Sequence, residues 1–151
     1  MSHPLPEYAD DMFCFATYNA AHVINRAYTP LLKPLGLTYP QYITLTLLWE
    51  TDGQSVGQLA KQLMMESSTL TPLIKRLESL GHVSRHRGLR DERQVFVRLT
   101  QSGRELKHHA ADITACMIAG TGMKIGDLQS LVFGLRKLTQ NLVAAQDTKS
   151  K

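Results

Sequence analysis

The sequence lacks long apolar runs and has only two cysteines, which argues against a membrane-spanning protein and against a disulfide-rich one. No window of the 151 residues approaches 18 consecutive apolar residues, so we predict that no helix spans a membrane. Cys14 and Cys116 are too few to make a disulfide framework. The acidic start, MSHPLPEYADD, lacks the charged and then apolar segments of a secretion leader. We therefore expect a cytoplasmic protein whose thiols are mostly reduced.

Sequence signatures of metal and cofactor sites are also missing. His108 and His109 are adjacent, so on a helix they point about 100° apart. No cluster of cysteines or carboxylates accompanies any of the six histidines. There is no glycine-rich phosphate loop, no convincing Ser/His/Asp arrangement and no internal repeat. The sequence therefore predicts neither a metal nor a cofactor.

Positive charge is concentrated in one part of the chain. The formal net charge is +4, and hydrophobic residues make up 43%, as in ordinary globular domains. Between residues 75 and 98, seven cationic side chains outnumber three acidic ones, so this segment accounts for the whole positive balance. The cationic residues are Lys75, Arg76, Arg85, Arg87, Arg90, Arg93 and Arg98. Such a concentrated basic stretch is typical of a surface that binds phosphates.

Apolar residues at three- and four-residue steps predict a mainly helical chain. A long helix is expected over 7–35, where the prolines at 30 and 34 kink or end it. Thr38 to Gln41 form a capping-box pattern that begins a second helix, and Ser55 caps a third. After a short connection at 64–66, Ser67 begins a fourth helix, which Gly81 stops. The third and fourth helices with their short turn are typical of a helix-turn-helix.

Two strands are predicted next, over 82–87 and 94–99, joined by the loop GLRDER. Thr100 then caps a long helix, which a Gly-Thr-Gly sequence at 120–122 interrupts, and a last helix follows. The predicted fold class is mainly α with a small β-hairpin. A winged helix-turn-helix lobe spans 38–99 and helical dimerisation arms span 7–35 and 101–145, in a single-domain chain of residues 1–151. The arms are too long and apolar for so small a core, so we expect them to interleave in a homodimer.

The polar face of the fourth helix predicts a DNA contact. Short hydroxyl side chains and one proline keep the backbone close to its partner, and two cations reach phosphates, as in a helix lying in a major groove. The candidates are Ser68, Thr69, Thr71, Pro72, Lys75 and Arg76. An ordinary solvated helix face is the alternative. Pro72 also requires either a helix start near Thr69 or a kink.

The hairpin supplies a second cationic surface. Arg90 and Arg93 lie at its tip, where arginine can enter a narrow minor groove, and Arg85 lies in its first strand. Asp91 is unfavourable near phosphates, so we interpret it as an ion-pair partner that directs the side chain of Arg93. A solvent-exposed turn with incidental charges is the alternative.

Cys14 lies between two phenylalanines near the start of the chain. A lone cysteine is usually a small buried hydrophobe. Here, however, the hydroxyls of Tyr18, Tyr28 and Tyr39 could stabilise a thiolate, which is the form that attacks peroxides. Cys116, on the long penultimate helix, is either part of the core or a resolving thiol for a sulfenic acid.

Five stretches carry a resemblance to a known family: FCFATY, GLTYPQY, STLTPLIKRLESLG, DERQVFVRLT and SGREL. In order and spacing they resemble the MarR family of winged-helix repressors, and within it the organic-hydroperoxide-sensing OhrR branch, over nearly the whole chain. The resemblance implies that Cys14 is the peroxidatic cysteine, that Tyr28 and Tyr39 hydrogen-bond its sulfur, and that Tyr18 lies nearby. It also implies that Cys116 forms a disulfide with Cys14 of the other subunit, as in the two-cysteine subclass.

The same resemblance places the recognition helix over the six candidates of the fourth helix and puts Arg93, held by Asp91, in the minor groove. Ser68 stands where these proteins usually have glycine, which bears on the identity of the operator.

We therefore hypothesise a cytoplasmic repressor, not an enzyme, that binds pseudo-palindromic double-stranded operator DNA as a homodimer. It would be released when organic hydroperoxide oxidises Cys14. One alternative is a MarR-type repressor released by a small aromatic ligand, with Cys14 structural. Another is a thiol peroxidase, although the chain lacks the peroxidatic loop, supported by arginine and threonine, that such an enzyme needs.

Overall fold

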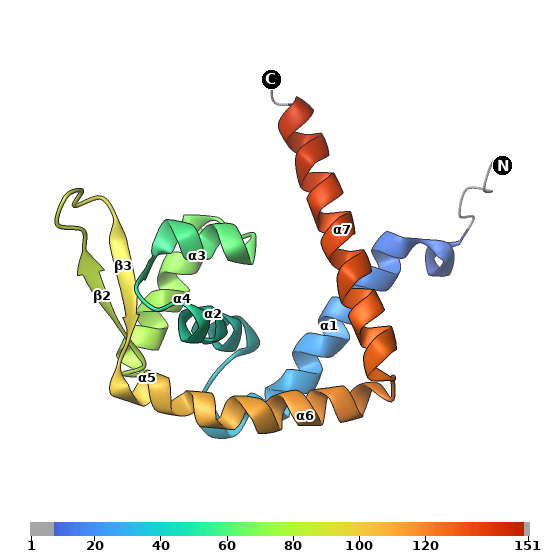
Figure 1. Ribbon diagram of the computed structural model, residues 1–151, viewed down its shortest axis with the longest axis horizontal. Coiled ribbons are helices and arrows are strands. Elements are labelled where there is room, and N and C mark those ends of the chain that lie inside the picture. Colours follow the sequence, from blue (N-terminus) through green and yellow to red (C-terminus); the bar gives the residue numbers. More distant parts are fainter. Residues whose placement is uncertain (1–7, 150–151) are drawn as a thin grey trace. The chain divides into compact units, whose positions relative to one another are not determined.

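The computed structural model describes residues 8–149 and divides into two compact units, one reaching to Ala111 and one from Asp112 onward (Figure 1). The first unit contains helices α1 (Phe13–Leu32), α2 (Tyr39–Glu50), α3 (Val56–Leu63), α4 (Ser67–Ser79) and α5 (Gln101–Glu105). It also contains strands β1 (Gln54–Ser55), β2 (Val83–Arg87) and β3 (Val95–Leu99) and short 3-10 turns at Ala9–Asp11, Lys33–Leu35 and Leu106–His109. Helix α6 (Ala110–Thr121) begins at the boundary, and α7 (Ile125–Lys149) lies in the second unit. No helix within 8–149 is both long and apolar enough to cross a membrane.

Helices α2, α3 and α4 pack against one another and against the strands, and together they form the core of the first unit (Figure 1). The apolar stripe of each helix is buried because its residues recur at helical spacing on one face. The fully buried side chains include Leu45, Leu48, Leu59, Leu70, Ile74, Leu77, Val83 and Val97. Because Leu70, Ile74 and Leu77 lie on the buried face of α4, the opposite face of this helix is the one exposed to solvent.

The predicted helix starts at Thr38, Ser55 and Thr100 are confirmed by their capping contacts. The Thr38 backbone N–H donates to the Gln41 side chain at 2.9 Å. At Ser55 both bonds of a capping box form, since its Oγ accepts from the Gln58 N–H at 3.1 Å and its own N–H donates to Gln58 Oε1 at 2.8 Å.

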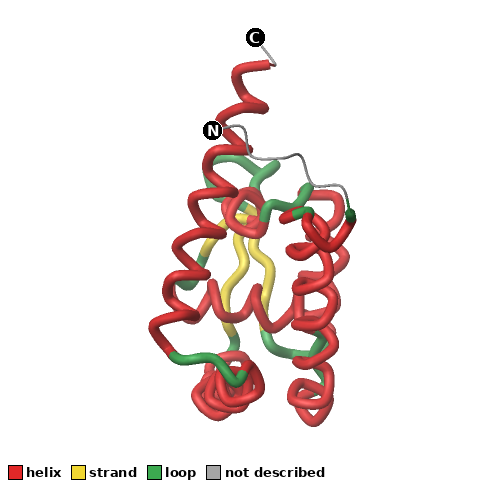
Figure 2. The backbone as a smooth tube through the Cα atoms, turned by 90° about the vertical axis from the view of Figure 1, so that its right-hand side faces the viewer, coloured by secondary structure: helices red, strands yellow, loops and turns green. Residues whose placement is uncertain are grey.

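The sheet has three antiparallel strands in the order β1-β3-β2, which lie side by side in Figure 2. The fold class is confirmed as mainly helical with a small β-sheet, and the predicted hairpin is its larger part. Strand β1 was not predicted, because a strand of two residues is too short to show an alternating pattern. Val97 pairs with Gln54 on one side and with Arg85 on the other.

Two helix predictions need correction, and the structure decides one choice that the sequence left open. The N-terminal helix begins at Phe13 and continues through Pro30, while residue 7, where the arm was predicted to start, lies outside the described residues. The helix predicted from Thr100 is broken by a 3-10 turn before α6. Helix α4 begins at Ser67, as predicted, so Pro72 lies inside the helix and the alternative of a start near Thr69 is excluded.

Candidate nucleic-acid interface and thiol site

The exposed face of α4 carries the predicted DNA-contacting residues. Glu66 occupies the N-cap position without a capping bond from its side chain, and the turn before it passes through Met64 in the left-handed region, with φ of 53°. Because one face of α4 is buried, the opposite face is open to a partner. The candidates on it are Ser68, Thr69, Pro72, Lys75 and Arg76, which are exposed, and Thr71, which is half-buried.

Two of these residues shape the first turns of α4. The Thr71 hydroxyl donates to the Ser67 carbonyl at 2.7 Å, so its oxygen remains an acceptor for a partner's donor. Pro72 has no N–H to offer the carbonyl of Ser68, four residues earlier, so that carbonyl lacks its usual helical donor.

The loop of residues 88–94 between β2 and β3, here called the wing loop, contains an ion pair between Asp91 and Arg93, as the sequence suggested. The carboxylate of Asp91 accepts from the Arg93 backbone N–H at 3.0 Å and from its Nε at 3.1 Å. These bonds lower the pKa of Asp91. The Arg93 side chain is nonetheless 92% exposed, so the far side of its guanidinium is free to meet a phosphate or a base edge.

Arg85, a cationic residue of the predicted hairpin, forms an ion pair with Glu78. Its Nε donates to Glu78 Oε2 at 2.8 Å, and its backbone N–H donates to the same carboxylate at 3.1 Å. These hydrogen bonds lower the pKa of Glu78. The pair joins β2 to α4, and it therefore fixes the wing relative to the exposed face of α4.

Replacing Glu78 with glutamine should destabilise the lobe modestly above pH 4.5, the ordinary pKa of a glutamate, and less at lower pH. The folded-state pKa is depressed, so the contribution of the pair is complete above the unfolded-state pKa and is lost as pH falls through the folded-state pKa. Because the Glu78 side chain is 36% exposed, the loss at pH 7 should be at most about 1 kcal/mol. Urea unfolding at several pH values measures it, with Glu92→Gln as the control. Equal losses for both variants, or a loss that does not change with pH, would contradict the pairing.

Cys14 is the second residue of α1 and is exposed, as is the neighbouring ring of Phe13. Tyr18, one turn further on, packs edge-on against His22 with ring centroids 4.4 Å apart. Because Cys14 is exposed in the single chain, it is not a small hydrophobic residue buried in the core of its own protomer.

Tyr28 and Tyr39 form a stacked pair far along α1 from Cys14. Their ring centroids are 4.3 Å apart, and Tyr42 lies 5.9 Å from Tyr28. Burial raises the pKa of Tyr28 and of Tyr39, so both stay protonated and act as O–H donors at neutral pH. Tyr28 lies fourteen positions after Cys14 on the same helix, so the two residues are about 21 Å apart along its axis. Neither phenol of this pair can therefore bond the sulfur of its own protomer.

Cys116 is also a free, exposed thiol, and it lies on α6. Large apolar side chains are exposed on α1 and α7 as well. They include Phe15, Val23 and Ile24 on α1 and Leu131, Val132, Phe133, Leu135, Leu142 and Val143 on α7. Within residues 8–149 no group of three or more His, Cys, Asp or Glu side chains could hold a metal.

Comparison with known proteins identifies the family. The model of the transcriptional regulator SarA/Rot family matches residues 26–110, the segment from the middle of α1 to the start of α6. The HTH-type transcriptional regulator TtmR of Methylorubrum extorquens is 44% identical over 92% of this chain and 71% of its own length. The chain belongs to the SarA/Rot family of winged-helix transcriptional regulators. It is therefore a transcriptional regulator that binds DNA.

Two further relatives carry names or structure titles that refer to hydroperoxide or to oxidation state. The organic hydroperoxide resistance transcriptional regulator of Bacillus subtilis is 38% identical over 88% of this chain and 90% of its own length, which supports the resemblance to the OhrR branch of MarR-type regulators. The structure of AbfR of Staphylococcus epidermidis matches with a TM-score of 0.74 at 28% identity, over 87% of this chain and 89% of that one. AbfR also matches as reduced protein bound to DNA, at 30% identity and a TM-score of 0.71. Its disulfide-formed structure matches at 31% identity and a TM-score of 0.61.

Sequence reasoning missed a close contact between α5 and the turn that follows α4. Gly103 is buried, and a Cβ built on it would lie 2.0 Å from the carbonyl oxygen of His82. The Gly103 carbonyl accepts from the Trp49 indole N–H at 2.9 Å. A lone glycine three residues after a threonine cap gave only a weak signal for this close approach, because the contact joins residues far apart in the chain.

Proposed function

We propose that this SarA/Rot-family regulator is a homodimeric repressor that releases a pseudo-palindromic operator when an organic hydroperoxide oxidises Cys14. The observation that carries the proposal is the position of Cys14, an exposed thiol at the start of a helix on which several apolar side chains, such as Phe13, Phe15 and Val23, are also exposed. A relative named for organic hydroperoxide resistance supports the choice of signal. The existence of both reduced and disulfide-formed AbfR structures supports a thiol switch.

The exposed apolar side chains of α1 and of α7 support the proposed dimer. Phe13 on α1 is 64% exposed and Phe133 on α7 is 71% exposed in the single chain, and exposed apolar surface on a helix is typical of an interface. A two-fold dimer would present two α4 helices to successive major grooves, one helical turn of DNA apart.

A dimer also supplies the phenols that Cys14 lacks within its own protomer. We place the Tyr28 and Tyr39 hydroxyls of the partner subunit beside the Cys14 sulfur, where their O–H groups would donate to a thiolate and stabilise it. Burial keeps these phenols protonated, so they are donors to the sulfur rather than competing anions.

The chemistry proposed for Cys14 has two steps. The thiolate attacks the terminal oxygen of a hydroperoxide, the O–O bond breaks, and the alkoxide leaves as an alcohol after protonation, so the sulfur becomes a sulfenic acid. Cys116 of the partner subunit, or a small cellular thiol, then attacks that sulfur; an S–S bond forms and water leaves. Moving a two-state equilibrium from 99:1 to 1:99 takes about 5.5 kcal/mol, which a covalent bond satisfied only in a displaced geometry can supply.

Cys116→Ser should leave the DNA affinity of the reduced protein unchanged and alter the oxidised product. After hydroperoxide treatment, the wild-type protein should run as a disulfide-linked dimer on a non-reducing gel, whereas the variant should run as a monomer carrying a sulfenic acid or a mixed disulfide. Dithiothreitol should return the wild-type protein to monomer on the gel. Only monomers in the treated wild type would contradict the intersubunit disulfide.

Arg93→Ala should weaken DNA binding by about 1–3 kcal/mol and leave the fold intact, because its side chain is 92% exposed and its ion pair is with the neighbouring Asp91. Fluorescence anisotropy with a duplex selected from random sequences measures the affinity. Arg136→Ala, which removes an exposed cation from α7, is the control. Equal affinity of Arg93→Ala and the wild type would exclude this arginine from the DNA contact.

A further inference from the structure

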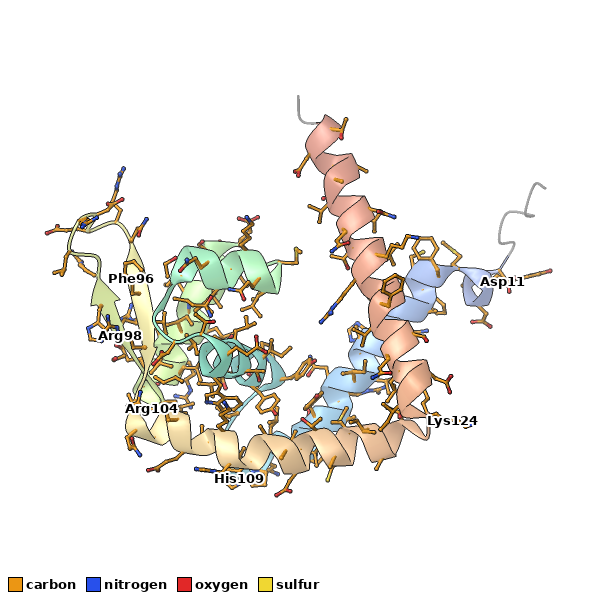
Figure 3. All side chains as sticks on the ribbon, viewed as in Figure 1. Asp11, Phe96, Arg98, Arg104, His109 and Lys124 are labelled. Atoms are coloured by element: carbon orange, nitrogen blue, oxygen red, sulfur yellow. The ribbon has the colours of Figure 1, made fainter. Side chains whose placement is uncertain are left out.

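The outer face of the sheet, which points away from the core, carries a cavity whose lining shares only Arg90 and Asp91 with the predicted DNA-contacting surface. Val97 and Leu99 of β3 are buried in the core, so the residues between and before them, Phe96 and Arg98, lie on the opposite face. Figure 3 labels both of these side chains on β3. His86 joins the same face, because the register pairs it with Phe96.

The cavity measures about 680 Å³, a size that suits a small organic molecule. Half-buried Phe96 gives it an apolar surface, and Leu89 of the wing loop adds a second one. Leu89 is completely exposed, which is unusual for leucine at the tip of a loop that is otherwise charged. An exposed leucine beside a half-buried phenylalanine is suited to the apolar body of a ligand.

The cavity walls are strongly cationic. Arg98, Arg90 and Arg87 all line it, and the structure records no ion pair for any of them within the described residues. The single acidic residue among the lining residues is Asp91, and its carboxylate is already bonded to Arg93. The charge left in the cavity is therefore positive, and it favours an anionic group on the ligand.

The loop that forms one wall is well defined by backbone contacts. Gly88 donates its N–H to the Gln94 carbonyl at 2.8 Å, and Gln94 donates to the Asp91 carbonyl at 3.1 Å. A Cβ on Gly88 would lie 2.6 Å from the Asp91 carbonyl oxygen and 3.3 Å from the Phe96 ring. Glycine therefore lets the loop approach Phe96 closely, and the cavity has a fixed wall.

We propose that this outer face of the wing binds a small organic anion, a carboxylate or sulfonate on an apolar body. Arg98, with Arg90 and Arg87, would hold the anionic group, while Phe96 and Leu89 would contact the apolar body. The site is independent of Cys14, so it would give the regulator a second input besides oxidation.

2-Naphthoate is the probe, added to the full-length reduced protein and followed by 15N–1H correlation spectra. Shifts should concentrate on residues 86–98, and Arg98→Glu should weaken binding roughly tenfold because it replaces a charged hydrogen-bond donor with a like charge. Lys61→Glu, an exposed charge reversal on α3, should change binding less than about twofold. Leu89→Ser, at a fully exposed side chain, should also weaken binding, and it keeps the test valid if Arg98→Glu does not fold.

Two ligand controls separate the charge from the apolar body. 2-Naphthalenemethanol has the same ring system without the anion, and sulfate at equal ionic strength has the anion without the ring system. Both should bind far more weakly than 2-naphthoate at this site. No binding of 2-naphthoate, shifts confined to α1 and α2, equal binding of either control ligand, or equal effects of Arg98→Glu and Lys61→Glu would each overturn the proposal.

Discussion

Cys14→Ser protein should bind operator DNA as tightly as the reduced wild type and should keep that affinity after hydroperoxide treatment. Serine has nearly the same size as cysteine and its hydroxyl is not oxidised, and Cys14 is exposed in the single chain, so the fold should be unaffected. Wild-type affinity should fall on the order of 100-fold or more under the same treatment, since a working switch needs several kcal/mol. Anisotropy titrations before and after treatment measure both effects.

Cys116→Ser is the matched control for this experiment, because it removes the other thiol but leaves the proposed sensor. It should still form a sulfenic acid at Cys14 and should still respond to the oxidant when a small thiol is present. Release of DNA from oxidised Cys14→Ser would show that another group senses the peroxide.

Gly103→Ala should destabilise the DNA-binding lobe by about 3 kcal/mol or more. The added methyl group would meet the His82 carbonyl oxygen at 2.0 Å and its carbon at 3.0 Å, and backbone atoms cannot swing aside as a side chain can. The same carbonyl accepts from the Thr100 N–H at 3.1 Å, so a shift would break that bond as well. Urea unfolding measures the loss.

Gly57→Ala is the control for this substitution within the same lobe. A Cβ at this position in α3 would lie 3.9 Å from the Ser55 hydroxyl, which is an ordinary contact, so alanine should be neutral or stabilising by up to about 1 kcal/mol. A loss below about 1 kcal/mol for Gly103→Ala would mean that the contact between α5 and the turn at His82 relaxes easily, which would contradict the tight approach described for Gly103.

The parts of the fold that sequence predicted well depend on neighbours in the chain. The capping residues at Thr38, Ser55 and Thr100 and the apolar stripes of α3 and α4 all act over three to seven residues, so pattern alone locates them. Strand β1 and the Gly103 contacts were missed because they depend on residues far away in the chain, Val97 for β1 and both His82 and Trp49 for Gly103.

In the candidate site too, contacts between near neighbours in the chain were predicted and contacts between distant residues were not. The pairing of Asp91 with Arg93 spans two residues and was predicted, whereas the pairing of Arg85 with Glu78 crosses from a strand to a helix and was not. Resemblance named Tyr28 and Tyr39 as partners of Cys14, but only the length of α1 shows that such a contact must cross between subunits.

The most direct test of the account is a DNA titration of one protein sample at increasing hydroperoxide, with thiol mass spectrometry on each aliquot. The account predicts that DNA affinity falls as the oxidised fraction of Cys14 rises, and that it returns when dithiothreitol restores the thiol. Undiminished affinity in a sample whose Cys14 is fully converted to the disulfide with Cys116 would contradict it.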